Sequence, residues 1–408
     1  MKTYEEYKVS GVKWLGKVPK HWEICRFKDF ISLQTQTSLS ENKIGLENIE
    51  CATGKFIETN SEFEGNGIAF DVGDVIYGKL RPYLKKVWLS TFNGNAVGDF
   101  FVFRAKNTNS ASYIRYVMLS DGFTKEADGS TFGTKMPRVS SNFIMSMRYF
   151  LPPPFEQQAI ADYLDAKTEK MDQMIAKAEK KIEYLGELKQ SLITRAVTRG
   201  LNPNTPLKDS GVNWIGNIPM HWDIACLRFF LRLINGRAYS QNELLPSGKY
   251  KVLRVGNFFT NDSWYYSNME LEPDKYCDKD DLLYAWSASV GPYIWNEAKT
   301  IYHYHIWKVQ LATSMDKMYS YYLLRAVTNQ KMSDMHGSTM MHITMGDMNK
   351  TKIPIPPLSE QQQIATYLDT KCSKIDHIIA TQKKKIAYLQ ELKQSLITNV
   401  VTGKIKVS

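Results

Sequence analysis

The sequence predicts an α+β fold in which two mixed, sheet-rich domains are joined by two long helices that form an antiparallel coiled coil within the chain. Three observations predict it: an internal repeat, a seven-residue apolar pattern in part of each copy, and strand-like inserts between the shared segments. The repeat is plainest at residues 187–194, Glu-Leu-Lys-Gln-Ser-Leu-Ile-Thr, which return unchanged at 391–398. Two copies of one unit usually pack with approximate two-fold symmetry, because like surfaces can then meet.

The shared frame extends upstream of these segments. Ser-Gly-Val-Lys-Trp-Leu-Gly at 10–16 returns as Ser-Gly-Val-Asn-Trp-Ile-Gly at 210–216, and His21-Trp22 returns as His221-Trp222. The inserts between the shared segments, about 21–154 and 221–357, do not match well. A repeated frame with two different inserts indicates a protein that reads two different things at a fixed separation.

The inserts are rich in Gly, Asn, aromatic and β-branched residues, a texture typical of short strands joined by turns. The short apolar runs at 74–77 and 281–284 predict strands, whereas 113–119 and 319–327 predict helical pieces. Prolines at 152–154 and at 354, 356 and 357 end each insert. We therefore expect domains at 1–154 and 210–357, a central helical region at 155–209 and a C-terminal helical region at 358–408.

Each helical region begins with Glu-Gln-Gln, at 156–158 and 360–362, where the glutamate suits the N-terminal helix dipole. A heptad pattern follows, which predicts a coiled coil between the two copies. Lys189 and Lys393 occupy normally apolar a positions, where a lysine costs stability but can fix register and orientation. The expected interface residues are Leu164, Met171, Ile175, Ile182, Leu185, Leu192, Leu368, Ile375, Ile379, Ile386, Leu389 and Leu396.

The bulk composition narrows the class of partner. The net charge is +10 and the pI is near 9.1, which favours a polyanionic partner. Apolar runs long enough to span a membrane are missing from the sequence, so we expect no membrane partner. The five cysteines are scattered without a Cys-x-x-Cys pair, which indicates free thiols in a reducing cytoplasm rather than disulfides or a zinc site.

This arrangement resembles the specificity subunit of type I restriction–modification systems, over essentially the whole chain. Its carriers are Pro-Pro-Phe-Glu-Gln-Gln-Ala-Ile-Ala at 153–161 and Pro-Pro-Leu-Ser-Glu-Gln-Gln-Gln-Ile-Ala at 356–365, each leading into a helix that ends in the repeated octapeptide. Gly-Asp-Val-Ile-Tyr-Gly-Lys-Leu-Arg-Pro-Tyr at 73–83 is similar to the family's target-recognition domains. The second insert keeps the strand at 280–286 but loses Gly-Lys-x-Arg-Pro.

The resemblance implies a subunit without catalytic activity, in which each target-recognition domain reads half of a split, asymmetric DNA sequence and the helices fix the unread spacer. It implies double-stranded DNA as a partner, together with two adenine-N6 methyltransferase subunits and, in the full complex, two ATP-dependent motor–nuclease subunits. We expect no cofactor for this chain, because no glycine-rich cofactor loop follows a clear strand in its sequence.

On this interpretation, basic, amide and aromatic residues on the inserts are candidates for DNA contact, arginine for guanine edges and lysine mostly for phosphate. The candidates are Lys79, Arg81, Lys85, Lys86, Lys135, Arg138, Arg237, Arg254, Asn257, Trp286 and Lys331. The Gly-Ser-Thr loops at 129–131 and 337–339 could also approach phosphates. Trp14, Trp22, Trp214 and Trp222 either contact partner subunits or close the frame by packing on the helix ends.

A self-contained nuclease or methyltransferase is the enzymatic alternative, and its motifs are incomplete. Residues 73–79 match the first seven positions of a phosphate-binding loop. The eighth position is Leu80, where the motif requires a Ser or Thr to bind magnesium. Pro273-Asp274 and Glu297-Ala298-Lys299 imitate a nuclease pattern at a loose spacing, and a solvated surface pair explains them better. Leu151–Phe155 lacks the Asn or Asp that adenine methyltransferases place before the prolines.

His303 and His305 would lie on one face of a strand but have no evident third or fourth metal ligand. We therefore expect no catalytic or metal site. The non-enzymatic alternative is a coiled-coil adaptor that joins two protein-binding domains, from which DNA binding would differ by its steep salt dependence.

Overall fold

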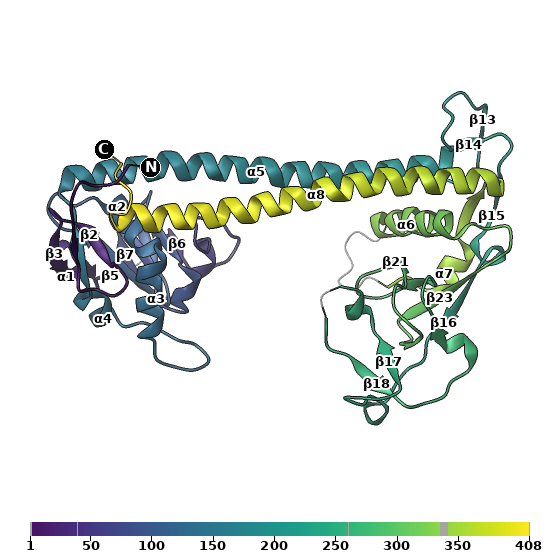
Figure 1. Cartoon of the computed structure of the whole chain (residues 1–408), viewed down its shortest axis with the longest axis horizontal. Coiled ribbons are helices and arrows are strands. Elements are labelled where there is room, and N and C mark those ends of the chain that lie inside the picture. The colour runs from purple at the N-terminus through teal and green to yellow at the C-terminus, as the bar shows by residue number, and fades with distance from the viewer. Residues whose placement is uncertain (1, 39, 260, 335–341, 408) are drawn as a thin grey trace. The chain divides into compact units, whose positions relative to one another are not determined.

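The computed structural model describes residues 2–38, 40–259, 261–334 and 342–407 (Figure 1). The chain forms two compact units: unit 1 comprises Met1–Glu179 and Lys383–Ser408, and unit 2 comprises Lys180–Gln382. Two long helices, α5 (Pro154–Arg199) and α8 (Leu358–Val401), contribute one part to each unit. Each unit therefore contains one sheet-rich domain and a pair of helix segments, and the α+β fold class predicted from the repeat is confirmed.

The domain of unit 1 contains two four-stranded sheets and two strand pairs. One sheet has the order β4 (Ile31–Gln34), β11 (Phe100–Ala105), β8 (Val75–Gly78), β9 (Val87–Leu89). The other has the order β5 (Thr37–Ser38), β7 (Gly67–Phe70), β10 (Gly94–Ala96), β6 (Lys43–Ile44). The strand pairs are β1 (Tyr7–Val9) with β2 (Lys17–Pro19), and β3 (Glu23–Arg26) with β12 (Arg148–Leu151).

Short helices connect these strands. They are α1 (Phe27–Phe30), α2 (Ala111–Leu119), α3 (Asp121–Gly129), α4 (Ser141–Ser146) and the 3₁₀ turns η1 (Leu46–Asn48) and η2 (Pro82–Leu84). Ser110, Ser120 and Ser140 cap α2, α3 and α4, because each hydroxyl accepts a hydrogen bond from a main-chain amide in the first turn. The predicted helical piece at 113–119 is thus confirmed as part of α2.

The domain of unit 2 repeats this plan. Its first sheet has the order β16 (Leu231–Asn235), β23 (Ile306–Leu311), β20 (Leu282–Ala285), β21 (Gly291–Ile294). Its second has the order β18 (Tyr265–Ser267), β17 (Tyr250–Leu253), β22 (Thr300–Tyr302), β19 (Tyr276–Cys277). The strand pairs are β13 (Leu207–Asp209) with β14 (Asn217–Pro219), and β15 (Asp223–Cys226) with β24 (Lys352–Ile355).

The remaining elements of unit 2 are α6 (Lys317–Asp334), α7 (Met345–Lys350) and the 3₁₀ turns η3 (Leu227–Phe229), η4 (Gln241–Glu243), η5 (Val255–Phe258) and η6 (Pro273–Lys275). The helix predicted at 319–327 is present within α6, which is longer at both ends. None of the helices in the described ranges is long and apolar enough to cross a membrane.

The two domains share a strand order although their sequences differ. The first sheets correspond strand for strand, and both are antiparallel throughout. In the second sheets, β7-β10-β6 corresponds to β19-β22-β17, and each contains one parallel pair. The fourth strand lies at opposite edges, β5 beside β7 in unit 1 but β18 beside β17 in unit 2. The repeat is therefore a common frame with a different edge on each domain.

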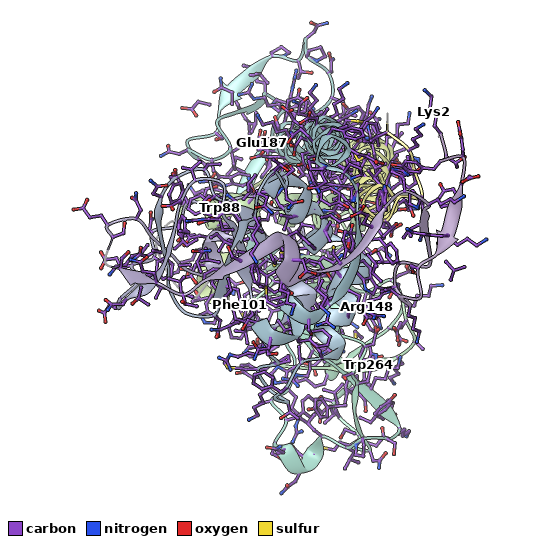
Figure 2. All side chains as sticks on the ribbon, turned by 90° about the vertical axis from the view of Figure 1, so that its left-hand side faces the viewer. Lys2, Trp88, Phe101, Arg148, Glu187 and Trp264 are labelled. Atoms are coloured by element: carbon purple, nitrogen blue, oxygen red, sulfur yellow. The ribbon has the colours of Figure 1, made fainter. Side chains whose placement is uncertain are left out.

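Each domain packs its core onto the helix pair of its own unit. In unit 1, Trp22, Phe27 and Tyr149 share a core with residues of α5 and α8, and the Tyr149 hydroxyl donates a 2.6 Å hydrogen bond to the carbonyl of Val401. In unit 2, the Tyr319 hydroxyl does the same with the carbonyl of Val197 at 3.3 Å. A second core in unit 1 lies around Trp88, which Figure 2 labels.

The helix segments run antiparallel within each unit. In unit 1, Lys393 near the end of α8 pairs with Asp172 in the first half of α5, and in unit 2 Lys189 of α5 pairs with Asp376 of α8. The residues expected at the coiled-coil interface are all buried or half-buried. By contrast, Tyr184 and Tyr388, which occupy equivalent positions in the repeat, are each 63% exposed.

Candidate nucleic-acid interface

A buried glutamate at the start of each long helix anchors the adjoining domain. Glu156 is 3% exposed and accepts hydrogen bonds from the hydroxyl of Tyr4 at 2.5 Å, Nε1 of Trp22 at 3.2 Å and, with its second oxygen, from Nε2 of His21 at 2.7 Å. Such charge-assisted bonds are stronger than neutral ones. The carboxylate therefore joins three side chains of the domain to the first turn of α5.

The same anchor recurs in unit 2. Glu360 accepts hydrogen bonds from Nε2 of His221 at 2.6 Å and Nε1 of Trp222 at 3.0 Å. Trp22 and Trp222 are both 0% exposed, so these two tryptophans close the frame rather than contact a partner. Of the other pair, Trp14 stacks on Tyr149, and Trp214 donates to the carbonyl of Lys352 at 3.3 Å.

A buried glutamine beside each glutamate has a role that the sequence did not reveal. The side-chain amide of Gln157 donates to the carbonyl of Pro152 and to Oδ1 of Asn109, both at 2.9 Å, while its oxygen accepts from the amide of Ser110 at 3.0 Å. Gln361 makes the corresponding three bonds in unit 2. The only signal in the sequence was the recurrence of glutamine after each helix-starting glutamate.

The first domain brings two of its candidate residues, Lys79 and Arg138, together around Asp99 at the end of β8. Asp99 accepts two hydrogen bonds from Arg138, at 2.9 and 2.8 Å, and lies 3.8 Å from Nζ of Lys79. The hydrogen bonds from Arg138 lower the pKa of Asp99, so the carboxylate stays ionised and orients the guanidinium. Lys79 also lies 5.6 Å above the ring of Phe101, labelled in Figure 2. Two basic groups against one acidic group leave this surface positive.

Arg81 lies next to this group in a strained backbone conformation. Its φ is +51°, and that of Lys85, at the other end of the 3₁₀ turn η2, is +49°. Residues with side chains rarely adopt this left-handed region, and such strain concentrates at functional sites. Between them Tyr83 is 50% exposed. The turn therefore presents an arginine and a tyrosine to solvent beside Lys79.

The ammonium groups of two other candidates in this domain are bonded to groups of the domain itself. Lys85 pairs with Asp121, and Lys86 donates to the carbonyls of Leu46 at 2.6 Å and Ile49 at 2.8 Å. A phosphate contact by either lysine would break these bonds, whereas Arg81 and Lys135 are exposed. The geometry thus favours the second pair as DNA contacts, which remain predictions.

The second domain presents a different chemistry. The guanidinium of Arg237 donates to Glu243 at 2.6 Å and lies over the ring of Tyr239. Arg254 is exposed and lies over Tyr265. The side chain of Asn257 is bonded within its own turn, to main-chain groups of Arg254, Asn261 and Ser263. Lys331 is half-buried on α6.

Trp286 belongs to an aromatic cluster with His303, Tyr304 and His305. Its Nε1 donates to the carbonyl of Tyr304 at 2.7 Å, and its ring meets that of His305 edge-on at 4.9 Å. The prediction that both histidines lie on one strand face was wrong, because the chain turns between β22 and β23 at these residues. The turn collects the three rings beside Trp286.

The histidines of this cluster are neutral at pH 7. Burial, followed by the nearby His305 and Arg254, lowers the pKa of His303 to about 4, and burial also lowers the pKa of His305. The amide of His305 points at Nδ1 of His303 at 3.5 Å, which is consistent with an unprotonated nitrogen. The cluster can therefore stack and form hydrogen bonds but adds no positive charge.

The described residues contain no group of three or more His, Cys, Asp or Glu side chains that could hold a metal ion. The glycine–lysine segment at 73–79 contains strand β8 rather than an open phosphate loop. Asp274 and Glu297 each pair with a different lysine, Lys275 and Lys251. The five cysteines are free. These findings give no support to the nuclease or nucleotide-binding alternatives.

Only one of the two Gly-Ser-Thr loops can be described. Ser130 and Thr131 follow α3, and their hydroxyls donate to the carbonyls of Ala127 and Asp128, both at 2.8 Å. The loop at 337–339 lies outside the described residues.

Comparison with known proteins agrees with this architecture. Residues 219–389 match the family described as Type I restriction modification DNA specificity domain. The Type I restriction enzyme MjaVIII specificity subunit of Methanocaldococcus jannaschii is 23% identical, covering 100% of this chain and 98% of that protein.

Two solved structures share the fold. One, described as the structural basis underlying complex assembly and conformational transition of the type I R-M system, has a TM-score of 0.75 at 19% identity and covers 95% of this chain and 99% of its own. The HsdS subunit from Thermoanaerobacter tengcongensis has a TM-score of 0.54 at 20% identity, covering 95% and 98%. Over essentially its whole length the chain is similar to type I restriction–modification specificity subunits, and its residues 219–389 match that family's DNA specificity domain.

Proposed function

We propose that the two domains read the two halves of a bipartite, asymmetric DNA site. The observation that carries this proposal is the shared strand order on which the two domains place different edges and different side chains. Unit 1 offers Lys79 and Arg138 around one aspartate, with Arg81 on the adjoining turn, whereas unit 2 offers Arg237 and Arg254 beside neutral aromatic rings. Two unlike surfaces on one frame suit two unlike half-sites.

The helix pair sets the length of the spacer between the half-sites. Lysines at a positions support this role, because each pairs with an aspartate on the opposing helix and only one register satisfies both pairs. A helix rises about 1.5 Å per residue, so inserted turns would change the separation that the helices impose.

The repeated frame also recruits the catalytic subunits. Two equivalent surfaces on one chain can bind two copies of the same partner, which supports two adenine-N6 methyltransferase subunits and two motor–nuclease subunits per chain. Tyr184 and Tyr388 support such surfaces, because both are exposed at equivalent places of the repeat. The complex would act on DNA in the cytoplasm, where the free thiols stay reduced.

The salt dependence of DNA binding tests this function against the adaptor alternative. The purified complex with its methyltransferase should lose about a thousandfold in affinity for duplex DNA between about 50 and 200 mM salt, because phosphate contacts release counterions. An adaptor held by apolar contacts would keep its protein partners over this range and show no specific DNA affinity, which would contradict the proposal.

A further inference from the structure

A short hairpin in unit 1 carries two large apolar side chains that no core covers. Its arms meet at Phe132 and Arg138, whose main-chain groups exchange hydrogen bonds of 3.1 and 3.0 Å. We call residues 132–138 the Phe132 hairpin. The side chains of Phe132 and Met136 are 61% and 55% exposed, and Figure 1 shows the chain between α3 and α4 leaving the body of the domain as a loop.

The hairpin is held firmly despite its exposure. Gly133 turns the chain at φ +91°, a conformation that favours glycine. The amide of Arg81 donates to the carbonyl of Pro137 at 2.8 Å, and the amide of Val139 donates to that of Lys79 at 3.1 Å. The base of the hairpin is therefore fixed to the segment that carries two of the candidate DNA contacts.

Positive charge surrounds the two apolar side chains. Lys135 is exposed between them in sequence, Arg138 forms the base of the hairpin, and Arg81 and Lys79 lie on the adjoining segment. Asp99 is the acidic partner of Arg138 and Lys79. Protein–protein interface cores are depleted of lysine, so this mixture fits a protein partner poorly. It fits duplex DNA, where basic groups hold phosphates while an apolar side chain enters between base pairs.

We propose that the Phe132 hairpin is a wedge that unstacks one base step in or beside the half-site read by the first domain. The ring of Phe132 enters the step, Met136 covers the exposed base edge, and Lys135 and Arg81 hold the flanking phosphates. The wedge makes affinity depend on how easily that step deforms, which adds specificity without a hydrogen bond to a base. This inference rests on the proposed DNA-reading function and adds a distortion step to it.

Fluorescence of 2-aminopurine tests the wedge, because this base brightens when it loses its stacking neighbours. The recognition site is first identified by sequencing the methylated DNA of cells that carry this chain and its methyltransferase. The probe is a short duplex that contains this site, with 2-aminopurine placed at each position of the first half-site in turn. The wild-type complex with its methyltransferase is compared with Phe132→Ala, with Phe132→Trp and with Thr134→Ala, a change of a small polar residue in the same loop. S-adenosylmethionine is left out so that no base is methylated during the measurement. A position that still brightens with Phe132→Ala does not depend on the ring of Phe132 and is assigned to the methyltransferase.

The wedge predicts one position that brightens with wild type, Phe132→Trp and Thr134→Ala but stays dark with Phe132→Ala. Phe132→Ala should bind the intact site about tenfold more weakly and recover most of this loss on a duplex with a mismatch at that step. Binding without any Phe132-dependent brightening would overturn the wedge and leave the proposed function standing. Absence of specific binding by wild type would overturn both, and loss of methyltransferase from the Phe132→Ala complex would assign the hairpin to a protein contact.

Discussion

Nζ of Lys393 lies 2.8 Å from Oδ1 of Asp172, and this ion pair joins the end of α8 to the first half of α5. The lysine side chain is only 9% exposed, and Lys55 approaches the same carboxylate at 3.0 Å. In unit 2, Lys189 and Asp376 repeat the pair at 2.6 Å. A lysine at a core position of each helix is thereby matched with one aspartate, which explains why the repeat keeps two charges in an otherwise apolar seam.

Removing the aspartate should cost more than removing the lysine. Asp172→Asn leaves an almost buried ammonium with weaker partners and should lower the free energy of unfolding by about 2 kcal/mol. Lys393→Met removes the charge at similar volume and should change it by less than about 1 kcal/mol. Urea unfolding measures both. Glu6→Gln, which breaks the exposed pair of Glu6 with Lys20, serves as the control and should have almost no effect; equal losses for all three variants would contradict this account.

Glu156 should contribute more to the stability of its domain than Glu360 does to the stability of the other. Glu156→Gln disturbs three hydrogen bonds to a buried carboxylate and should destabilise the first domain by about 2–3 kcal/mol. Glu360→Gln disturbs two bonds to a side chain that is 33% exposed and should cost about 1 kcal/mol. Hydrogen exchange of each domain in the intact chain reports them separately. A larger effect at Glu360 would show that the buried cluster around Tyr4 is not the stronger anchor.

Arg81 should move stability and DNA affinity in opposite directions. Arg81→Gly relieves the left-handed backbone and should raise the free energy of unfolding by about 0.5–1 kcal/mol. The same change removes a proposed DNA contact and should weaken binding about tenfold. Lys86→Met should instead lower stability, since its ammonium is bonded to two carbonyls inside the domain. Thermal unfolding and DNA titration of the same preparations test this, and unchanged affinity in Arg81→Gly would remove Arg81 from the interface.

His303 should make unit 2 sensitive to acid. Its folded pKa of about 4 lies below the ordinary value of 6.5, so between these values the unfolded chain binds a proton that the folded chain does not. Stability is then constant above about pH 6.5 and falls as the pH drops towards 4. His303→Gln should remove about 1 kcal/mol of this fall, allowing for solvent around a half-buried ring. Urea unfolding of both proteins at several pH values decides it; parallel curves would contradict the assignment.

Local patterns predicted the frame because local chemistry determines it. Prolines end each insert and the heptad continues from there, so α5 and α8 begin at Pro154 and Leu358 within a residue of expectation. The helix predicted at 319–327 extends to Asp334. Its last residues were not predicted as helical, because they are mostly polar and lack the apolar periodicity that indicates a helix. The turn at His303 escaped prediction, since its backbone direction depends on contacts with Arg237 and Leu253 far away in sequence.

The candidate DNA contacts show the same limit. Composition distinguishes basic residues but not where their charges point, and Lys86 and Arg81 look alike in the sequence. Only the fold shows that the first is bonded to main-chain carbonyls and that the second lies exposed on a strained turn. Gln157 was overlooked for the converse reason, because its three hydrogen bonds join segments that only folding brings together.

The proposal that each domain recognises its own half-site independently is tested most directly by single-molecule methylation sequencing. DNA is sequenced from three kinds of cell, all of which carry the neighbouring methyltransferase. The first also carries this chain, the second lacks this chain, and the third carries a version whose residues 21–154 come from a relative. The account predicts a split motif with N6-methyladenine in both halves, absent without the chain and altered in one half only by the exchange. No new methylation although the chain and methyltransferase co-purify, or a change in both halves, would contradict it.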